Sequence, residues 1–211
     1  MTQGQSPLAI AQFPLGGRFE TVARHDLGIE GGHSNALADR GGETNYGISL
    51  RFAVAEGVVD ANHDGFKDLD LDFDGDIDGQ DIRALTPDEA LNLYYTCIWR
   101  RLDLDNLPKP LDGAVFDQAL NCGAVAAVKM LQRALNRMPL TCAPLAIDGG
   151  LGRITQAAIG MCIRLPDGVA LLLDKYRQEA ELHYNAIVRA DPTQVEWLKG
   201  WVNRARRLGD V

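Results

Sequence analysis

Three oxygen-bearing side chains near the start of the chain have the types and spacing needed for acid–base chemistry. Glu30 directly precedes two glycines, Asp39 follows nine positions later, and Thr44 comes after a second glycine pair. A general acid must hold a proton near neutral pH, and a second polar group can then stabilise charge or orient water. The three residues therefore predict hydrolytic chemistry in which Glu30 donates the proton.

A helix over residues 18–30 is expected to position Glu30. Apolar residues recur in this segment at helical spacing, at Phe19, Val22, Ala23 and Leu27. Gly31 and Gly32 are well suited to end the helix. Glu30 would then lie on the last turn, where the negative end of the helix dipole favours a protonated carboxyl group.

Asp39 and Thr44 each have two interpretations. Asp39 could be the second catalytic carboxylate, or it could accept hydrogen bonds from turn amides, as aspartate does before glycines. Thr44 could orient a water molecule, or it could cap the element that follows. The residues alone leave both questions open.

The pattern across residues 30–48 resembles the signature of glycoside hydrolase family 108, the phage-type N-acetylmuramidases that include endolysins and secretion activator proteins. The matching residues are Glu30-Gly31-Gly32 and Asp39-x-Gly41-Gly42-x-Thr44-Asn45-Tyr46-Gly47-Ile48. The resemblance implies that Glu30 is the catalytic acid and that Asn45 and Tyr46 contact the substrate. His33 departs from the pattern, because the family often has tyrosine there.

Later segments are similar to the peptidoglycan-binding region that follows the catalytic segment in this family. They comprise residues 116–123, 131–132 and 147–155, together with a C-terminal stretch around Trp197 and Trp201. Asp117 and Asn121 are four residues apart and share one helix face. They could line a sugar cleft or tie helices together. Asp148-Gly149 is expected to form a turn before a helix.

Residues 70–81 match the EF-hand calcium loop. Oxygen ligands recur at the required positions, a glycine lies at the sharp turn and Ile77 lies at position 8. The expected ligands are the side chains of Asp70, Asp72, Asp74, Asp78 and Asp81 and the backbone carbonyl of Asp76. So many carboxylates repel one another unless a cation neutralises them. A structural calcium ion is therefore expected, with no cofactor for catalysis; the alternative is a disordered acidic loop.

A second, incomplete loop precedes it. Residues 60–68 begin with the same spacing of acidic residues. Lys67 and Leu71, however, occupy positions 8 and 12, where an EF-hand loop needs other residues. The two loops would also share residues, so both cannot be complete EF-hands. The first is either a partial site or a source of one ligand for the second.

The negative charge of the chain is concentrated in this acidic segment. The formal net charge is −8, and residues 60–81 contain nine aspartates and one lysine, which alone amount to −8. The rest of the chain has 20 acids (29 − 9) and 20 bases (21 − 1) and is neutral. The sequence has no stripe of basic residues of the kind that binds nucleic acid, so nucleic-acid binding is not expected. The acidic segment does not argue against an anionic polymer as a partner elsewhere on the surface.

Further helices are expected from periodicity and capping signals. Ser49 should cap a helix over 50–56, and Thr86 and Glu89 should form a capping box for a helix over 86–101. Helices are also expected over 112–123, from about 125 to 135 and over 168–189. A Thr193–Glu196 capping box should begin a last helix whose apolar face contains Trp197, Leu198 and Trp201.

The expected fold is mainly α, a lysozyme-like helical fold with an inserted EF-hand-like calcium loop. Its parts would be an N-terminal arm over 1–17, a muramidase domain over 18–110 containing the acidic insert 60–81, and a helical peptidoglycan-binding region over 111–211. No apolar run approaches the roughly 20 residues of a membrane span, so no stable membrane insertion is expected. A monomer is expected.

The route to the cell wall is inferred from the N-terminus. Residues 1–18 lack a basic start followed by an apolar core, so no secretory signal is expected. The protein would be made in the cytoplasm and reach the periplasm or exterior through a holin pore or another route without a signal. The four cysteines are widely spaced and are expected to be reduced.

The resemblance implies a peptidoglycan hydrolase that cuts the β-1,4 bond between N-acetylmuramic acid and N-acetylglucosamine. Glu30 would protonate the leaving oxygen, and Asp39 would support an oxocarbenium-like state or position water. The alternative is a non-catalytic, calcium-stabilised protein that only binds the cell wall.

Overall fold

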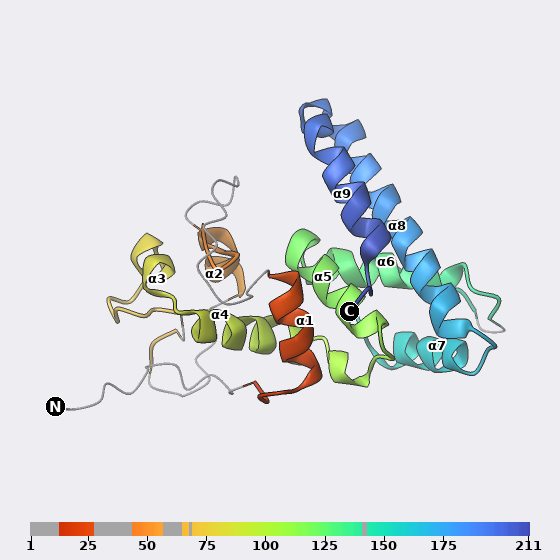
Figure 1. The fold of residues 1–211 in the computed structure, drawn as a ribbon, viewed down its shortest axis with the longest axis horizontal. Helices are drawn as coiled ribbons and strands as arrows, with labels where there is room; N and C mark the ends of the chain where they lie inside the picture. Colours follow the sequence, from red (N-terminus) through yellow and green to blue (C-terminus); the bar gives the residue numbers. More distant parts are fainter. Residues whose placement is uncertain (1–12, 28–43, 57–64, 68, 141–142) are drawn as a thin grey trace. The chain divides into compact units, whose positions relative to one another are not determined.

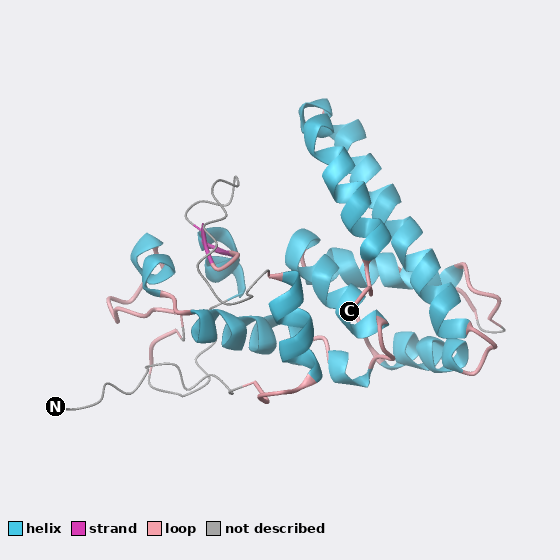
Figure 2. Cartoon of the chain, in the orientation of Figure 1, coloured by secondary structure: helices cyan, strands magenta, loops and turns pink. Residues whose placement is uncertain are grey.

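The computed structural model describes residues 13–27, 44–56, 65–67, 69–140 and 143–211 (Figure 1). Helices make up most of these residues, and the strands among them form one short hairpin (Figure 2). The predicted mainly α, lysozyme-like fold class is therefore confirmed. No helix in the described ranges is long and apolar enough to cross a membrane.

The chain divides into two compact units, Met1–Arg101 and Leu102–Val211. The predicted division after residue 110 falls just before α5. The described elements of the first unit are α1 (Arg18–Asp26), β1 (Thr44–Asn45), β2 (Ile48–Ser49), α2 (Leu50–Glu56), α3 (Gly79–Ala84), α4 (Pro87–Tyr94) and η1 (Tyr95–Arg100).

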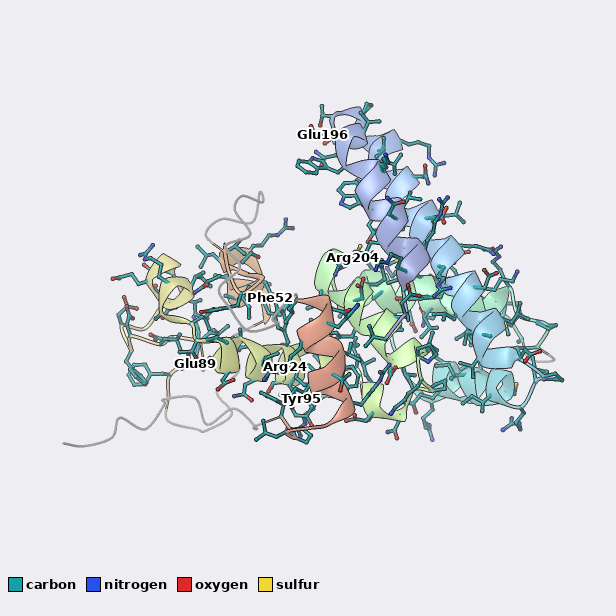
Figure 3. All side chains as sticks on the ribbon, viewed as in Figure 1. Arg24, Phe52, Glu89, Tyr95, Glu196 and Arg204 are labelled. Carbon is teal, nitrogen blue, oxygen red and sulfur yellow. The ribbon has the colours of Figure 1, made fainter. Side chains whose placement is uncertain are left out.

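An aromatic cluster holds α1 in the first unit. The ring of Phe19 lies 5.0 Å from that of Tyr95, 5.5 Å from that of Trp99 and 5.7 Å from that of Phe13, centroid to centroid. Figure 3 labels Tyr95 beside α1. Phe19, Val22 and Ala23 are buried as predicted. Burial of these side chains fixes α1, the element that leads toward Glu30 in the sequence.

The predicted helix over 86–101 forms, but its second half has a different geometry. Thr86 and Glu89 make the predicted capping box, and α4 then continues into η1, a π-helix. Cys97, Ile98 and Trp99 are consecutive and all buried. The wider π turn reduces the angle between successive side chains, which lets three neighbours in sequence face the same core.

The second unit is a helical assembly that contains η2 (Leu104–Asn106), α5 (Leu111–Cys122), α6 (Ala124–Asn136), α7 (Arg153–Ile163), α8 (Gly168–Ala190), η3 (Pro192–Gln194) and α9 (Val195–Arg207). The helix expected over 168–189 is thus confirmed as α8, which has 23 residues. Its Tyr176 is buried against α6 and donates a hydrogen bond from its hydroxyl to the Ala127 carbonyl, at 3.3 Å.

The C-terminal hairpin of α8 and α9 differs from prediction at its tip (Figure 1). The Thr193–Glu196 capping box does not form; Asp191 instead accepts a hydrogen bond from the Thr193 amide and begins η3. Pro192 follows Asp191 and suits the first position of a helical turn, so the turn begins before Thr193.

The predicted apolar face of α9 is only partly buried. Trp201 stacks on Tyr184 of α8 at 5.5 Å, whereas Trp197 is 56% exposed. No residue from 185 to 204 is buried, because this end of the hairpin is two helices packed on each other. Trp197 of the predicted apolar face is therefore exposed, and Trp201 makes the aromatic contact with α8.

Three of the four cysteines, Cys97, Cys122 and Cys162, are free thiols, as predicted. Burial raises the pKa of the Cys122 thiol, which keeps it protonated. Cys142 lies outside the described residues.

Candidate active site and acidic loop

The two predicted carboxylates of the active site, Glu30 and Asp39, lie outside the described residues, as does His33. The helix expected over 18–30 is observed as α1, which ends earlier, at Asp26, with Leu27 as its C-cap. The Leu27 amide donates to the Ala23 carbonyl at 2.9 Å, which closes the last turn. The placement of Glu30 on the last turn of this helix is therefore not supported by α1.

The third predicted catalytic residue, Thr44, begins a tight hairpin. Thr44 pairs with Ser49, and Asn45 pairs with Ile48 across an antiparallel ladder. The two residues between them, Tyr46 and Gly47, both have positive φ, at 48° and 78°. Positive φ at both positions is typical of the type I′ turn, a common two-residue hairpin loop, and it explains the glycine at the second position of the motif.

The hairpin is fixed to α4 through its loop. The Tyr94 hydroxyl donates a hydrogen bond to the Tyr46 carbonyl at 3.4 Å, and burial raises the pKa of Tyr94 far above its ordinary value. A Cβ atom at Gly47 would lie 2.9 Å from the Tyr94 oxygen, so only glycine fits there without displacement. Tyr46 itself is half-buried.

The side chain of Asn45 is occupied by structural contacts. Its Nδ2 donates to the Ile82 carbonyl at 3.0 Å and the Leu85 carbonyl at 3.3 Å. Both carbonyls lie at the C-terminal end of α3, where helix carbonyls lack partners within the helix. Asn45 thus joins the hairpin to α3. No local residue pattern predicts this contact, and the substrate contact expected of Asn45 stays a prediction.

Replacing Asn45 by alanine should reduce the unfolding free energy by about 1–3 kcal/mol, because two carbonyl acceptors would lose their donor. Thermal melting of the variant measures this. Asn203→Ala, which changes an exposed asparagine of α9, is the matched control and should melt like the wild type. A rise in KM at unchanged melting temperature would show instead that Asn45 acts through substrate.

Of the pair Asp117 and Asn121, Asp117 makes a tie between helices, which was one of the two interpretations. The Asn121 Nδ2 donates to the Asp117 carbonyl at 2.7 Å, and the Arg204 Nε donates to the two carboxylate oxygens of Asp117 at 3.0 and 3.1 Å. The Arg204 contact links α5 to α9, whereas the Asn121 contact lies within α5; Figure 3 labels Arg204 on α9. The alternative role in a sugar cleft stays a prediction.

The acidic loop over residues 70–81 is folded around the carboxylates at its two ends, Asp70 and Asp81. The Asp70 carboxylate is 3% exposed and accepts hydrogen bonds from the amides of Asp74, at 3.0 Å, and Gly75, at 2.9 Å. Gly75 has φ +100° at the sharp turn, and Ile77 is buried. Asp81 accepts from the amides of Leu71 and Asp78 and closes the loop onto α3.

Three carboxylates of the loop converge. One oxygen from each of Asp70, Asp72 and Asp74 lies within 4.8 Å of the others, and oxygens around a calcium ion at 2.3–2.6 Å have such separations. Desolvation and then the charge of Asp74 raise the pKa of Asp72, while the charge of Asp74 is the main cause that raises the pKa of Asp76. The loop therefore concentrates negative charge that a cation would neutralise.

The incomplete loop over residues 60–68 is mostly outside the described residues. Of it, residues 65–67 are described, and Phe66 packs edge-on against Phe73 at 5.4 Å. A second ion or a shared ligand there stays a prediction.

Comparison with known proteins gives matches to two family models and to a solved structure. The family model described as Glycosyl hydrolase 108 matches residues 23–123, and the one described as Predicted Peptidoglycan domain matches residues 126–206. A search of curated proteins gives no match. Among solved structures, that of Brucella abortus SagA is similar, with 25% sequence identity, a TM-score of 0.65, and 91% of each chain covered.

Proposed function

We propose that the chain is an N-acetylmuramidase, because residues 23–123 match the Glycosyl hydrolase 108 model and residues 126–206 match the Predicted Peptidoglycan domain model, which together indicate a peptidoglycan hydrolase. The bond it cuts would be the β-1,4 link between N-acetylmuramic acid and N-acetylglucosamine. The observation that carries the proposal is the match of residues 23–123, which contain the Glu-Gly-Gly and Thr-Asn-Tyr-Gly elements.

In the proposed mechanism, Glu30 protonates the glycosidic oxygen as the bond to the anomeric carbon breaks. Asp39 stabilises the oxocarbenium-like sugar or positions the water that completes the hydrolysis, and Thr44 orients that water. The fixed hairpin supports this role for Thr44, because β1 is held by the β2 ladder and by the Asn45 contacts with α3. A residue on a fixed element can hold water in a constant position.

The new reducing end identifies the bond that is cut. Purified peptidoglycan digested with the protein would be reduced with borohydride, hydrolysed and analysed for amino sugar alcohols. A muramidase leaves N-acetylmuramic acid at the reducing end and should yield muramitol. Glucosaminitol would show cleavage of the other glycosidic bond, and wall binding without any reducing sugar would favour the non-catalytic alternative.

Replacing Asp39 by asparagine distinguishes its two interpretations. If the carboxylate stabilises charge or positions water, the rate should fall by about 10²-fold or more while the melting temperature is unchanged. The measurements are initial rates on purified peptidoglycan and thermal melting of the same sample. A lower melting temperature with near-normal rates in the cold would make Asp39 a turn residue.

The proposal includes a structural calcium ion in the loop over residues 70–81. Its ligands would be the five side chains of Asp70, Asp72, Asp74, Asp78 and Asp81 and the carbonyl of Asp76. The convergence of three carboxylates supports this assignment, because close like charges repel unless a cation neutralises them. The ion would neutralise the loop and have no part in bond cleavage.

A further inference from the structure

The second unit contains an open cavity of about 430 Å³ beside α7. Its lining comes from α7, which contributes Ala157, Ala158 and Met161, and from the preceding segment, which contributes Ala143 and Leu145. Its volume lies in the range of ligand pockets, which are mostly apolar and contain a few polar groups that fix orientation. The methyl-rich lining therefore favours a ligand with small alkyl groups.

One charged side chain, Arg153, is found among the described residues that line this cavity. Arg153 begins α7 and is exposed, and the neighbouring Ile154 is 77% exposed. A guanidinium group pairs with carboxylates through two parallel hydrogen bonds. The cavity therefore combines an apolar floor with a single cationic group at its lining, which complements an anionic end attached to small apolar groups.

The wall of the cavity is held rigidly by polar side chains of α6. Asn136 donates to the Leu145 carbonyl at 2.9 Å and accepts from the Leu145 amide at 2.7 Å. Gln132, which is 1% exposed, donates to Asp148 at 2.7 Å and to the Gly150 carbonyl at 3.0 Å. The segment before α7 is thus fixed before any ligand arrives, which reduces the entropy lost on binding.

The lining fits a peptide better than a sugar. A sugar presents several hydroxyl groups, and burying them without partners costs free energy. Apart from Arg153, the described lining side chains have no hydrogen-bonding groups other than the weakly accepting sulfur of Met161. Peptidoglycan also contains short peptides rich in alanine methyl groups and free carboxylates, which supply the complementary chemistry.

We propose that this cavity binds the alanine-terminated stem peptide of peptidoglycan, with Arg153 pairing with the terminal carboxylate. The proposal rests on the proposed function in that peptidoglycan is the substrate. It gives the second unit a specific task, because contact with stem peptides would keep the enzyme on the polymer while the first unit acts on the glycan.

The test is a titration of the full chain with the synthetic peptide L-Ala–γ-D-Glu–L-Lys–D-Ala–D-Ala, followed by NMR up to millimolar concentration. Amide signals of Ala143, Ile154 and Ala157 should shift. Amidation of the peptide C-terminus, or Arg153→Gln, should weaken binding about tenfold, since a charged hydrogen bond is lost. Ala157→Phe should abolish binding by filling the cavity. Arg164→Gln, which changes an exposed arginine at the other end of α7, should bind like the wild type.

Several outcomes would overturn the proposal. These are the absence of peptide binding at millimolar concentration, equal affinity in wild type and Arg153→Gln, or binding of dodecanoate or chitotetraose to these residues in place of the peptide. Glu30→Gln should bind the peptide normally. Peptidoglycan cleavage without peptide binding would contradict this inference alone, whereas peptide binding without cleavage would contradict the proposed hydrolase.

Discussion

Replacing Glu30 by glutamine is expected to lower the rate of peptidoglycan cleavage by about 10²- to 10⁴-fold, which is the usual contribution of general acid catalysis. Glutamine keeps the length and planar end of the side chain, but it has no proton that it can transfer to the leaving oxygen. Initial rates of reducing-sugar release on purified peptidoglycan measure the effect, and binding of the variant to the same polymer should be unchanged.

The matched control is Glu196→Gln, which makes the same chemical change at an exposed position in the first turn of α9 (Figure 3). It should cleave at the wild-type rate. Near-normal activity of the Glu30→Gln protein would contradict the assignment of Glu30 as the catalytic acid. If the variant melts at the wild-type temperature, its lost activity cannot be attributed to unfolding.

Calcium is expected to raise the unfolding free energy by about 2.7 kcal/mol when its free concentration is 100 times the dissociation constant. The ion would bind the folded loop, where Asp70, Asp72 and Asp74 converge, and not the unfolded chain. Thermal melting across a series of buffered calcium concentrations measures this dependence. Addition of a chelator should reverse it, while cleavage at low temperature should persist.

Asp74→Ala should abolish the dependence on calcium, because it removes one of the converging carboxylates. Asp88→Ala is the control, since Asp88 is an exposed acid of α4 outside the loop; this variant should retain the full calcium response. Identical melting curves of the wild type in calcium and in chelator would show that residues 70–81 do not bind the ion.

Signals carried by neighbouring residues allowed correct prediction of several caps and turns, although the Thr193–Glu196 capping box does not form. Ser49 begins α2 as expected, with its hydroxyl accepting from the Phe52 amide at 3.2 Å, and Thr86 begins α4. Asp148 accepts from the Gly150 amide at 2.7 Å in the predicted turn before α7. Caps and turns depend on residues within four positions of one another, so they can be predicted from local residue patterns.

Contacts between distant segments could not be predicted in the same way. The pairing of Arg204 with Asp117 joins residues 87 positions apart, and the contact of Asn45 with Ile82 joins residues 37 positions apart. The π geometry of η1 likewise depends on the core that surrounds it. For the candidate site, the motif could be recognised from the sequence. The hydrogen bonds of Asn45 could not, because they depend on where α3 lies in the fold.

The helix α3 makes the acidic segment inseparable from the hairpin of the hydrolase motif. Asp78 and Asp81 at its start belong to the loop, while the carbonyls of Ile82 and Leu85 near its end hold Asn45. A chain shortened by removal of residues 60–81 would lose the first three residues of α3, and with them the helix start that positions the carbonyls of Ile82 and Leu85 for Asn45. In evolutionary terms, the loop cannot be gained or lost as a module on its own; a relative without it must support the same hairpin with a different partner.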